Sequence, residues 1–282
     1  MSDTDLYVDR RLAEGYPGLE QLAHEAYLSH LEKSRTDSGE EQRISKLLTY
    51  LNRIIDVTPP KKLLVVGCGP KPYTLELLLE RGYDTIGIEP IPSFVDSGNE
   101  YLAAADRLLK GSAENVPLGN GSQDVVFLES VLEHVDSPIR CLNEIYRVLA
   151  PGSLLYVVTT NRYRFSIRGR NGEYNVKFYN WFPNLVKESL VFRHLHYEPH
   201  LANYTERPAV HWFSYDDLCR LGRMAGFAQF YSVLDVLRAN DPSVTKSWWR
   251  QRLLKKMQHN PWLRACILTQ IGGTIFMLKR PG

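Results

Sequence analysis

The sequence predicts an α/β fold, in which a mostly parallel sheet is covered by helices on both faces. Short apolar runs, each long enough for one strand, alternate with segments of helical period between residues 59 and 160, and this alternation is typical of a parallel sheet. Glycine and proline mark several of the boundaries between these segments. The chain of 282 residues is 44% apolar and 23% charged, a globular composition that excludes fibrous and disordered classes.

The first 58 residues predict a helical cap that precedes the sheet. Apolar residues recur there at helical spacing, most regularly from Ile44 to Ile55. The run Thr58-Pro59-Pro60 ends this region, because proline cannot continue a helix and restricts the residue before it.

The elements of the sheet follow in order along the chain. Strands are expected at 63–66, 85–88, just before Gly111, 124–128 and 153–159. Helices are expected between them at 73–81, 93–104 and 137–149. Gly82 stops the first of these helices, and Ser137-Pro138 opens the last with an N-cap and a first-turn proline.

Regular structure resumes after an irregular stretch of 52 residues. A helix is expected from Ser214 to Gly226, with Asp217 completing a capping box. Two closing strands bring the total to seven, at 227–236 and 273–279. We therefore predict one sheet domain with two insertions, the first lid-like and the second basic and aromatic: domain 59–282, insertions 161–212 and 242–264.

The residues that follow the first two strands predict a ligand site. In an open parallel sheet, ligands bind outside the carboxyl ends of the strands. Gly67-Cys68-Gly69 follows the first strand, and glycines there let the backbone turn sharply and approach a ligand. Glu89 ends the second strand, where a carboxylate can accept both hydroxyls of a ribose. This pair of features fits either a dinucleotide or S-adenosylmethionine.

Three further features favour S-adenosylmethionine over a dinucleotide. Pro72 stands where a dinucleotide loop has its third glycine, GSAENVP follows the third strand from residue 111, and FLESVLEHV runs off the fourth from residue 127. Together with VVGCG, IGIEP and RVLAPGS, these residues resemble the class I S-adenosylmethionine-dependent methyltransferases, in the small-molecule group known as type 11. The resemblance implies a Rossmann-like sheet of seven strands, the last of them antiparallel, with S-adenosylmethionine as the cofactor.

The resemblance also implies where each part of the cofactor lies. The expected contacts are Gly67, Cys68 and Gly69 with the methionine part, Glu89 with the ribose hydroxyls, Ile91, Ser112 and Ala113 with the adenine, and Glu129 at the end of the fourth strand. Lys71 and Ser112 depart from the family, which usually has glycine at the first place and often aspartate at the second.

Methyl transfer from a sulfonium is an in-line displacement that depends on positioning, and it also needs a proton acceptor when the nucleophile is a hydroxyl or amine. The hypothesis is transfer to a small molecule, most readily at oxygen. A nucleic-acid base is not expected, because LESV stands where base methyltransferases carry an Asn/Asp-Pro-Pro-Tyr loop. The alternatives are N-methylation, a lipid-linked or sugar substrate at a membrane surface, a nicotinamide oxidoreductase, and a non-catalytic module that binds an anionic membrane or partner.

The first insertion is expected to cover the substrate, because it holds 11 aromatic residues in 52. The expected substrate contacts are Asn161, Arg164, Trp181 and Trp212, and the basic residues around them suggest an anionic or glycosylated substrate. Candidates for the general base are His134, His211 and Tyr163, and His134 is expected one turn into the helix that follows the fourth strand. No metal site is expected, because no acid or cysteine completes the set of His194, His196 and His200.

Charge is unevenly distributed along the chain. The segment 242–282 carries eight Lys or Arg and no Asp or Glu, which leaves a net charge of −6 on the rest because the whole chain has a net charge of +2. Tryptophans interleave with the cations, so peripheral membrane contact through 246–262 is one interpretation and packing on the body is the other. The four cysteines are far apart in the sequence, and we expect reduced thiols and a cytoplasmic protein.

Overall fold

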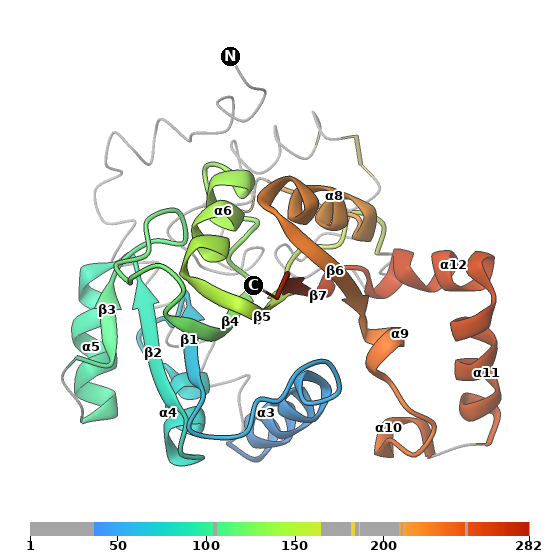
Figure 1. Cartoon of the computed structure of the whole chain (residues 1–282), viewed down its shortest axis with the longest axis horizontal. Helices are drawn as coiled ribbons and strands as arrows, with labels where there is room; N and C mark the ends of the chain where they lie inside the picture. Colours follow the sequence, from blue (N-terminus) through green and yellow to red (C-terminus); the bar gives the residue numbers. More distant parts are fainter. Residues whose placement is uncertain are drawn as a thin grey trace.

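The computed structural model describes most of the chain, namely residues 37–103, 106–164, 211–245 and 248–281 together with Phe182, Pro183, Val186 and Ala209. Seven strands form one sheet: β1 (Lys62–Val66), β2 (Asp84–Glu89), β3 (Leu108–Lys110), β4 (Gln123–Glu129), β5 (Leu149–Val158), β6 (Phe227–Ser232) and β7 (Thr274–Lys279). Their order is β3-β2-β1-β4-β5-β7-β6 (Figure 1). Strand β7 is antiparallel to both neighbours, whereas the pairs from β3 to β5 are parallel. The predicted fold class is confirmed.

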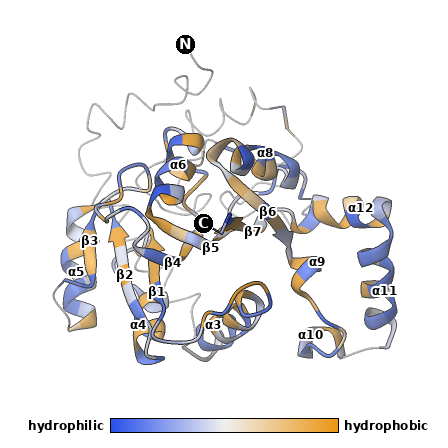
Figure 2. Ribbon diagram, in the orientation of Figure 1, coloured by the Kyte–Doolittle hydropathy of each residue, from blue (hydrophilic) through white to orange (hydrophobic). Residues whose placement is uncertain are grey.

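Helices cover the two faces of the sheet, and each face has its own apolar core. On one face lie α3 (Asp37–Leu51), α4 (Tyr73–Glu80) and α5 (Pro92–Leu102), and on the other α6 (Pro138–Val148) and α8 (Tyr215–Ala225). The central strands carry mainly apolar side chains, and the covering helices show both hydrophobic and hydrophilic colours (Figure 2). This distribution is typical of a sheet that is buried on both faces.

The chain between β6 and β7 forms four further helices. They are α9 (Val233–Val236), α10 (Pro242–Thr245), α11 (Trp248–His259) and α12 (Pro261–Ile271). None of the helices in the described part of the chain is long and apolar enough to cross a membrane.

The helix boundaries follow from local capping chemistry. The Ser137 hydroxyl accepts a hydrogen bond from the Arg140 amide at the start of α6. Ser214 and Asp217 form a reciprocal capping box on α8, and Gly226 ends that helix with φ of +103°. These contacts satisfy backbone groups that the helix itself leaves without partners.

Three places differ from the sequence-based expectation by more than two residues, and the first is β5, which begins at Leu149 rather than at residue 153. The strand predicted at 227–236 ends at Ser232, because Ser232 and Asp235 form a capping box that begins α9. His134 was expected one turn inside a helix, but it lies in a turn that precedes α6. Ser130 has a left-handed φ of 54° directly after β4, so the chain bends there and the helix begins only at Pro138.

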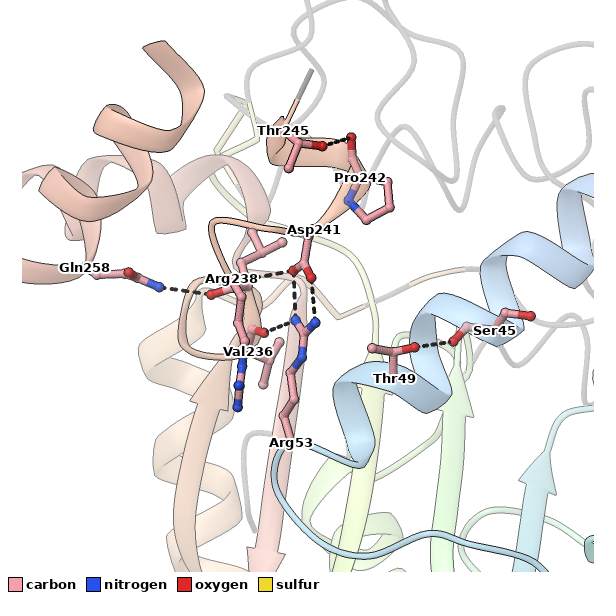
Figure 3. A network of polar contacts seen from close by, with 10 residues as sticks. Ser45, Thr49, Arg53, Val236, Arg238, Asp241, Pro242, Thr245 and Gln258 are labelled. Atoms are coloured by element: carbon pink, nitrogen blue, oxygen red, sulfur yellow. Dashed lines mark hydrogen bonds and ion pairs between the residues drawn. The ribbon is translucent and has the colours of Figure 1, made fainter. Parts of the chain in front are cut away.

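Helix α3 joins the sheet to the insertion between β6 and β7. Its apolar side packs into the core of its face of the sheet through Ile44, Leu47, Leu48 and Leu51. Just beyond its end, the Arg53 guanidinium donates to both carboxylate oxygens of Asp241 and, at 2.6 Å, to the Val236 carbonyl (Figure 3). Both members of the ion pair are largely buried, with side chains 15% and 9% exposed. Of the predicted N-terminal cap, residues 1–36 lie outside the described residues.

We expect Asp241→Asn to destabilise the protein. The Arg53 hydrogen bonds hold the pKa of Asp241 below its usual value. A lowered carboxyl pKa stabilises the fold above the unfolded pKa of about 4, and this contribution disappears as the pH falls through the folded pKa. Removing one partner of a largely buried pair costs about 3 kcal/mol. Urea unfolding should therefore show a loss of this size at pH 7 that shrinks under acidic conditions.

The control is Asp84→Asn, which breaks an ion pair with Arg107 at the surface. These side chains are 40% and 47% exposed, so the loss should stay below about 1 kcal/mol. Equal effects of the two substitutions would contradict a special role for Asp241.

Candidate active site

The register of the parallel strands brings the candidate site residues into one row. Val66, the last residue of β1, is paired with Ile88 of β2 and Leu128 of β4. The next residue along each of these strands is therefore Gly67, Glu89 or Glu129. Successive positions on parallel strands stay level with one another, so these three residues meet at the carboxyl edge of the sheet.

Two glycines of the first loop adopt backbone conformations that other residues rarely take. Gly67 has φ of +73° and Gly69 has φ of +66°. A Cβ on Gly67 would lie 2.5 Å from Cγ2 of Val131, which belongs to the turn after β4. The loop thus turns directly against that second turn, with space only for a residue that lacks a side chain.

Cys68 lies between these glycines, but its thiol points away from the loop surface. The side chain is buried, and Sγ lies 3.4 Å from the Val65 carbonyl oxygen. Gly87 on β2 makes room for it, since a Cβ there would lie 2.5 Å from the sulfur. Burial raises the pKa of the thiol well above its usual value, which keeps it protonated. Cys68 can therefore meet a ligand through its backbone but not as a thiolate.

The Glu89 carboxylate is held in place by two backbone amides. Oε2 accepts from the Gly69 amide at 2.9 Å, and Oε1 accepts from the Ile91 amide at 3.3 Å. The residue is 5% exposed. An ionised carboxylate has about four acceptor positions, and these two bonds orient Glu89 at the edge of the sheet. Ile91 is itself buried, at the start of α5.

Glu129 at the end of β4 has a partner that sequence reasoning missed. Arg43 of α3 donates to Glu129 Oε1 at 2.6 Å and to Thr74 Oγ1 at 2.8 Å, and it is also paired with Glu40 at 2.9 Å. Thr74 is in the first turn of α4, directly after the glycine loop. Arg43 thus bridges the N-terminal helix and two of the segments that build the site.

No local signal in the sequence marks this contact. Arg43 and Glu129 are 86 positions apart, and an arginine on the polar side of a helix is ordinary.

Two acidic side chains anchor the loop after β3 to its neighbours in the fold. Ser112 and Asn115 exchange backbone hydrogen bonds of 3.3 and 3.1 Å and form a tight turn, in which Ala113 is buried. Glu114 accepts from the amides of residues 136 and 137, and Glu144 accepts from the amide of Val116. The loop expected beside the adenine is therefore well anchored next to the turn after β4.

The structure brings two of the three candidate bases close together. Burial is the main cause that lowers the pKa of His211 below its usual value, and the neighbouring His134 lowers it further. The His211 Nε2 hydrogen-bonds to the Val135 carbonyl at 2.9 Å, so it carries a proton in the neutral ring. The His211 backbone is held by Glu133 and Thr160 on either side. Tyr163 is half exposed and lies beyond the end of β5.

The predicted substrate residues fall into different environments. Asn161 is buried, and its amide bonds to the Thr269 carbonyl and to the Tyr163 backbone amide. Trp212 is also buried, whereas Arg164 is exposed. Trp181 and most of the 161–212 insertion, including His194, His196 and His200, lie outside the described residues. Within the described ranges, no three His, Cys, Asp or Glu side chains are grouped as a metal site would require.

Comparison with known proteins finds methyltransferases that resemble the central part of the chain. Residues 64–157 match the family model of a methyltransferase domain. An uncharacterized methyltransferase of Mycobacterium tuberculosis is 36% identical over 102 residues, which are 36% of this chain and 41% of the relative. An uncharacterized methyltransferase of Schizosaccharomyces pombe is 30% identical over 116 residues, covering 37% of this chain and 41% of the relative.

A solved structure agrees with this match at the level of the fold. A SAM-dependent methyltransferase from Archaeoglobus fulgidus superposes with a TM-score of 0.51 and 15% identity over 90% of this chain and 99% of its own. The match over residues 64–157 indicates a methyltransferase domain, and the likeness to the Archaeoglobus protein shows that the whole sheet shares its fold. The chain matches only 41% of the length of either sequence relative.

We expect Gly67→Ala to destabilise the glycine loop for two separable reasons. The new Cβ meets the Val131 side chain, and alanine disfavours the positive φ. The combined loss in the free energy of unfolding should be about 2–4 kcal/mol. Adding Val131→Ala removes the clash but not the strained φ, so the double variant should lose less than the two single variants added together. Simple additivity in denaturant unfolding would show that the close approach is unimportant.

Proposed function

We propose that this protein transfers a methyl group from S-adenosylmethionine to a small-molecule acceptor, most readily an oxygen, by in-line displacement. The observation that carries the proposal is the buried Glu89 carboxylate, oriented by the Gly69 and Ile91 amides at the carboxyl end of β2. A carboxylate at this point of a doubly wound sheet is suited to bind a ribose diol. The family match of residues 64–157 supports the same cofactor.

The residues at the sheet edge fit the separate parts of that cofactor. We assign the backbone of Gly67, Cys68 and Gly69 to the methionine part, because the loop lacks side chains that would block a close approach. Glu89 would accept the ribose hydroxyls. The remaining contacts are proposed around the adenine and at the end of β4: Ile91, Ser112, Ala113 and Glu129.

The bound sulfonium supplies an activated methyl group, so the protein has to position the acceptor and remove its proton. We propose His211 as the proton acceptor, with His134 as its neighbour. A base must be unprotonated, and burial of His211 favours the neutral ring at physiological pH. With Nε2 donating to Val135, the basic nitrogen of this ring is Nδ1. Tyr163 is the weaker candidate because it is half exposed.

The 161–212 insertion is proposed to select the substrate. Arg164 at its start is exposed and cationic, which suits an anionic or glycosylated acceptor. We propose that Asn161 and Trp212 form part of the wall of the substrate site, since both are buried at the two ends of the insertion. Trp181 remains a proposed contact from the sequence alone. We propose a cytoplasmic location, based on the free cysteines of the chain.

We expect Glu89→Gln to reduce the affinity for S-adenosylhomocysteine by about 10–100-fold, because a neutral amide is a weaker acceptor for two hydroxyls. Isothermal titration calorimetry measures the change. The matched control is Glu76→Gln, which removes a carboxylate of α4 that accepts a hydrogen bond from Tyr101 of α5, away from the sheet edge. Unchanged affinity of the folded Glu89 variant would refute the assignment.

Turnover separates the proposed enzyme from a module that only binds. The protein is incubated with S-adenosylmethionine carrying a ¹³C-methyl group and a fraction of small metabolites. We expect the label in low-molecular-weight products, and its chemical shift distinguishes O-methyl from N-methyl groups. Cofactor binding without any transfer of label would favour the non-catalytic alternative.

We expect His211→Gln to lower kcat by about 10²–10⁴-fold while leaving the affinity for S-adenosylhomocysteine unchanged. In the native protein, kcat should rise with pH through a pKa below the usual histidine value and then level off, because only the neutral ring accepts a proton. The variant should lose this rise. A larger effect of His134→Gln, with His211→Gln near native activity, would transfer the role to His134.

A further inference from the structure

The helices between β6 and β7 form a projecting arm, residues 233–272, with a small core of its own. Leu234, Val244 and Leu254 are buried together, from α9, α10 and α11 respectively. Met257 and Ile267 pack against this cluster, so α11 and α12 are held through one side each. The arm lies beyond the β6 edge of the sheet, with α11 farthest from the strands (Figure 1).

The outer side of α11 combines tryptophan with positively charged side chains. Successive residues are turned by about 100° around a helix, so six residues of α11 fall within about 120° of one another, opposite the buried Leu254. All six are exposed: Trp248, Trp249, Arg252, Lys255, Lys256 and His259. The ribbon of α11 is mainly hydrophilic in colour, in contrast to the sheet (Figure 2).

The neighbouring helix α12 adds an uncharged exposed side. Trp262 near its N-terminus is 83% exposed, compared with 69% for Trp248 and 50% for Trp249. Ala265 and Cys266 follow it on the same side and are exposed as well. Tryptophan normally buries most of its large apolar surface. Three exposed tryptophans in adjacent helices therefore indicate a surface that binds something.

The arm has no acidic groups left to balance its cations. Between residues 233 and 273 the sequence has seven Lys or Arg and two acids, Asp235 and Asp241. Asp235 is paired with Arg264 at 2.7 Å, and Asp241 is paired with Arg53 of the body. Among the described residues, no carboxylate is paired with the exposed cations of α11.

We propose that this surface of α11 and α12 binds the face of an anionic lipid bilayer. The cations match the charge of lipid headgroups, and tryptophan side chains bind well at the boundary between headgroups and acyl chains. A nucleic acid would also attract cations, but it leaves the uncharged surface around Trp262, Ala265 and Cys266 without a partner. The lipid surface accommodates both parts at once.

The inference does not depend on methyl transfer, because it rests on residues far from the Glu89 edge. It places the proposed methyl transfer at the surface of an anionic membrane. The Arg53–Asp241 pair ties the arm to α3, and Arg43 of the same helix reaches Glu129 in the candidate site. The sheet would therefore be held at a defined orientation when the arm lies on the membrane.

Sedimentation with lipid vesicles tests this proposal with the full-length protein. Vesicles of phosphatidylcholine alone are compared with vesicles that contain an equal amount of phosphatidylglycerol. We expect binding only to the anionic vesicles, weakened by salt, with a blue shift of tryptophan emission and quenching by brominated acyl chains. Lys255→Glu with Lys256→Glu should lower the partition coefficient at least about tenfold, given the effect of single charges near such a surface.

In the matched control, two exposed cations of the sheet domain are reversed by Lys62→Glu and Arg223→Glu. This control variant should bind vesicles at least about tenfold more tightly than the α11 variant. Trp262→Ala should reduce binding and quenching without changing the net charge. Affinity for S-adenosylhomocysteine serves as the folding check for every variant. Absence of vesicle binding, equal loss in the control, or binding to a single-stranded RNA oligonucleotide that vesicles do not displace would each overturn the proposal.

Discussion

The parallel pairing of β2, β1 and β4 is the constraint on which the rest of the site depends. It makes Gly67, Glu89 and Glu129 neighbours although long stretches of chain separate them. Once the strand ends are level, backbone amides of one loop can hold a carboxylate of the next strand, as Gly69 does for Glu89. The two amide hydrogen bonds from Gly69 and Ile91 orient the buried carboxylate. The glycine loop after β1 and the end of β2 thus hold each other in place through this hydrogen bond.

The sequence predicted the parts of the molecule that depend on local pattern. The central strands appear as continuous apolar runs, and the order of the seven predicted strands along the chain placed Glu89 and Glu129 at the sheet edge. The starts of α6 and α8 could be predicted because helix capping also depends on residues that are close in the sequence. Where the prediction was wrong, at His134 and at the end of β6, short-range side-chain bonds had redirected the backbone over a few residues.

Contacts between distant side chains could not be predicted in this way. The bonds from Arg43 to Glu129 and from Arg53 to Asp241 join segments that are 86 and 188 positions apart, and neither pair has a period or motif. The form of the arm was equally hidden, because basic and aromatic residues in α11 are compatible with packing or with exposure. Only the three-dimensional arrangement, with Leu254 buried and Trp248 outside, separates these interpretations.

Arg43 in the middle of α3 and Arg53 just after its end make ionic contacts with segments that the matched family region, residues 64–157, contains only in part. Substitutions at these two arginines, in the sheet at Glu129 and in the arm at Asp241 should therefore depend on one another during evolution. A lineage that loses the acid at position 241 leaves a nearly buried guanidinium without a counterion, so position 53 should drift with it. In an alignment of close relatives, the same reasoning makes positions 43 and 129 a covarying pair. Exchange of whole insertions between homologues would succeed most easily where an acid is retained at the contact with α3.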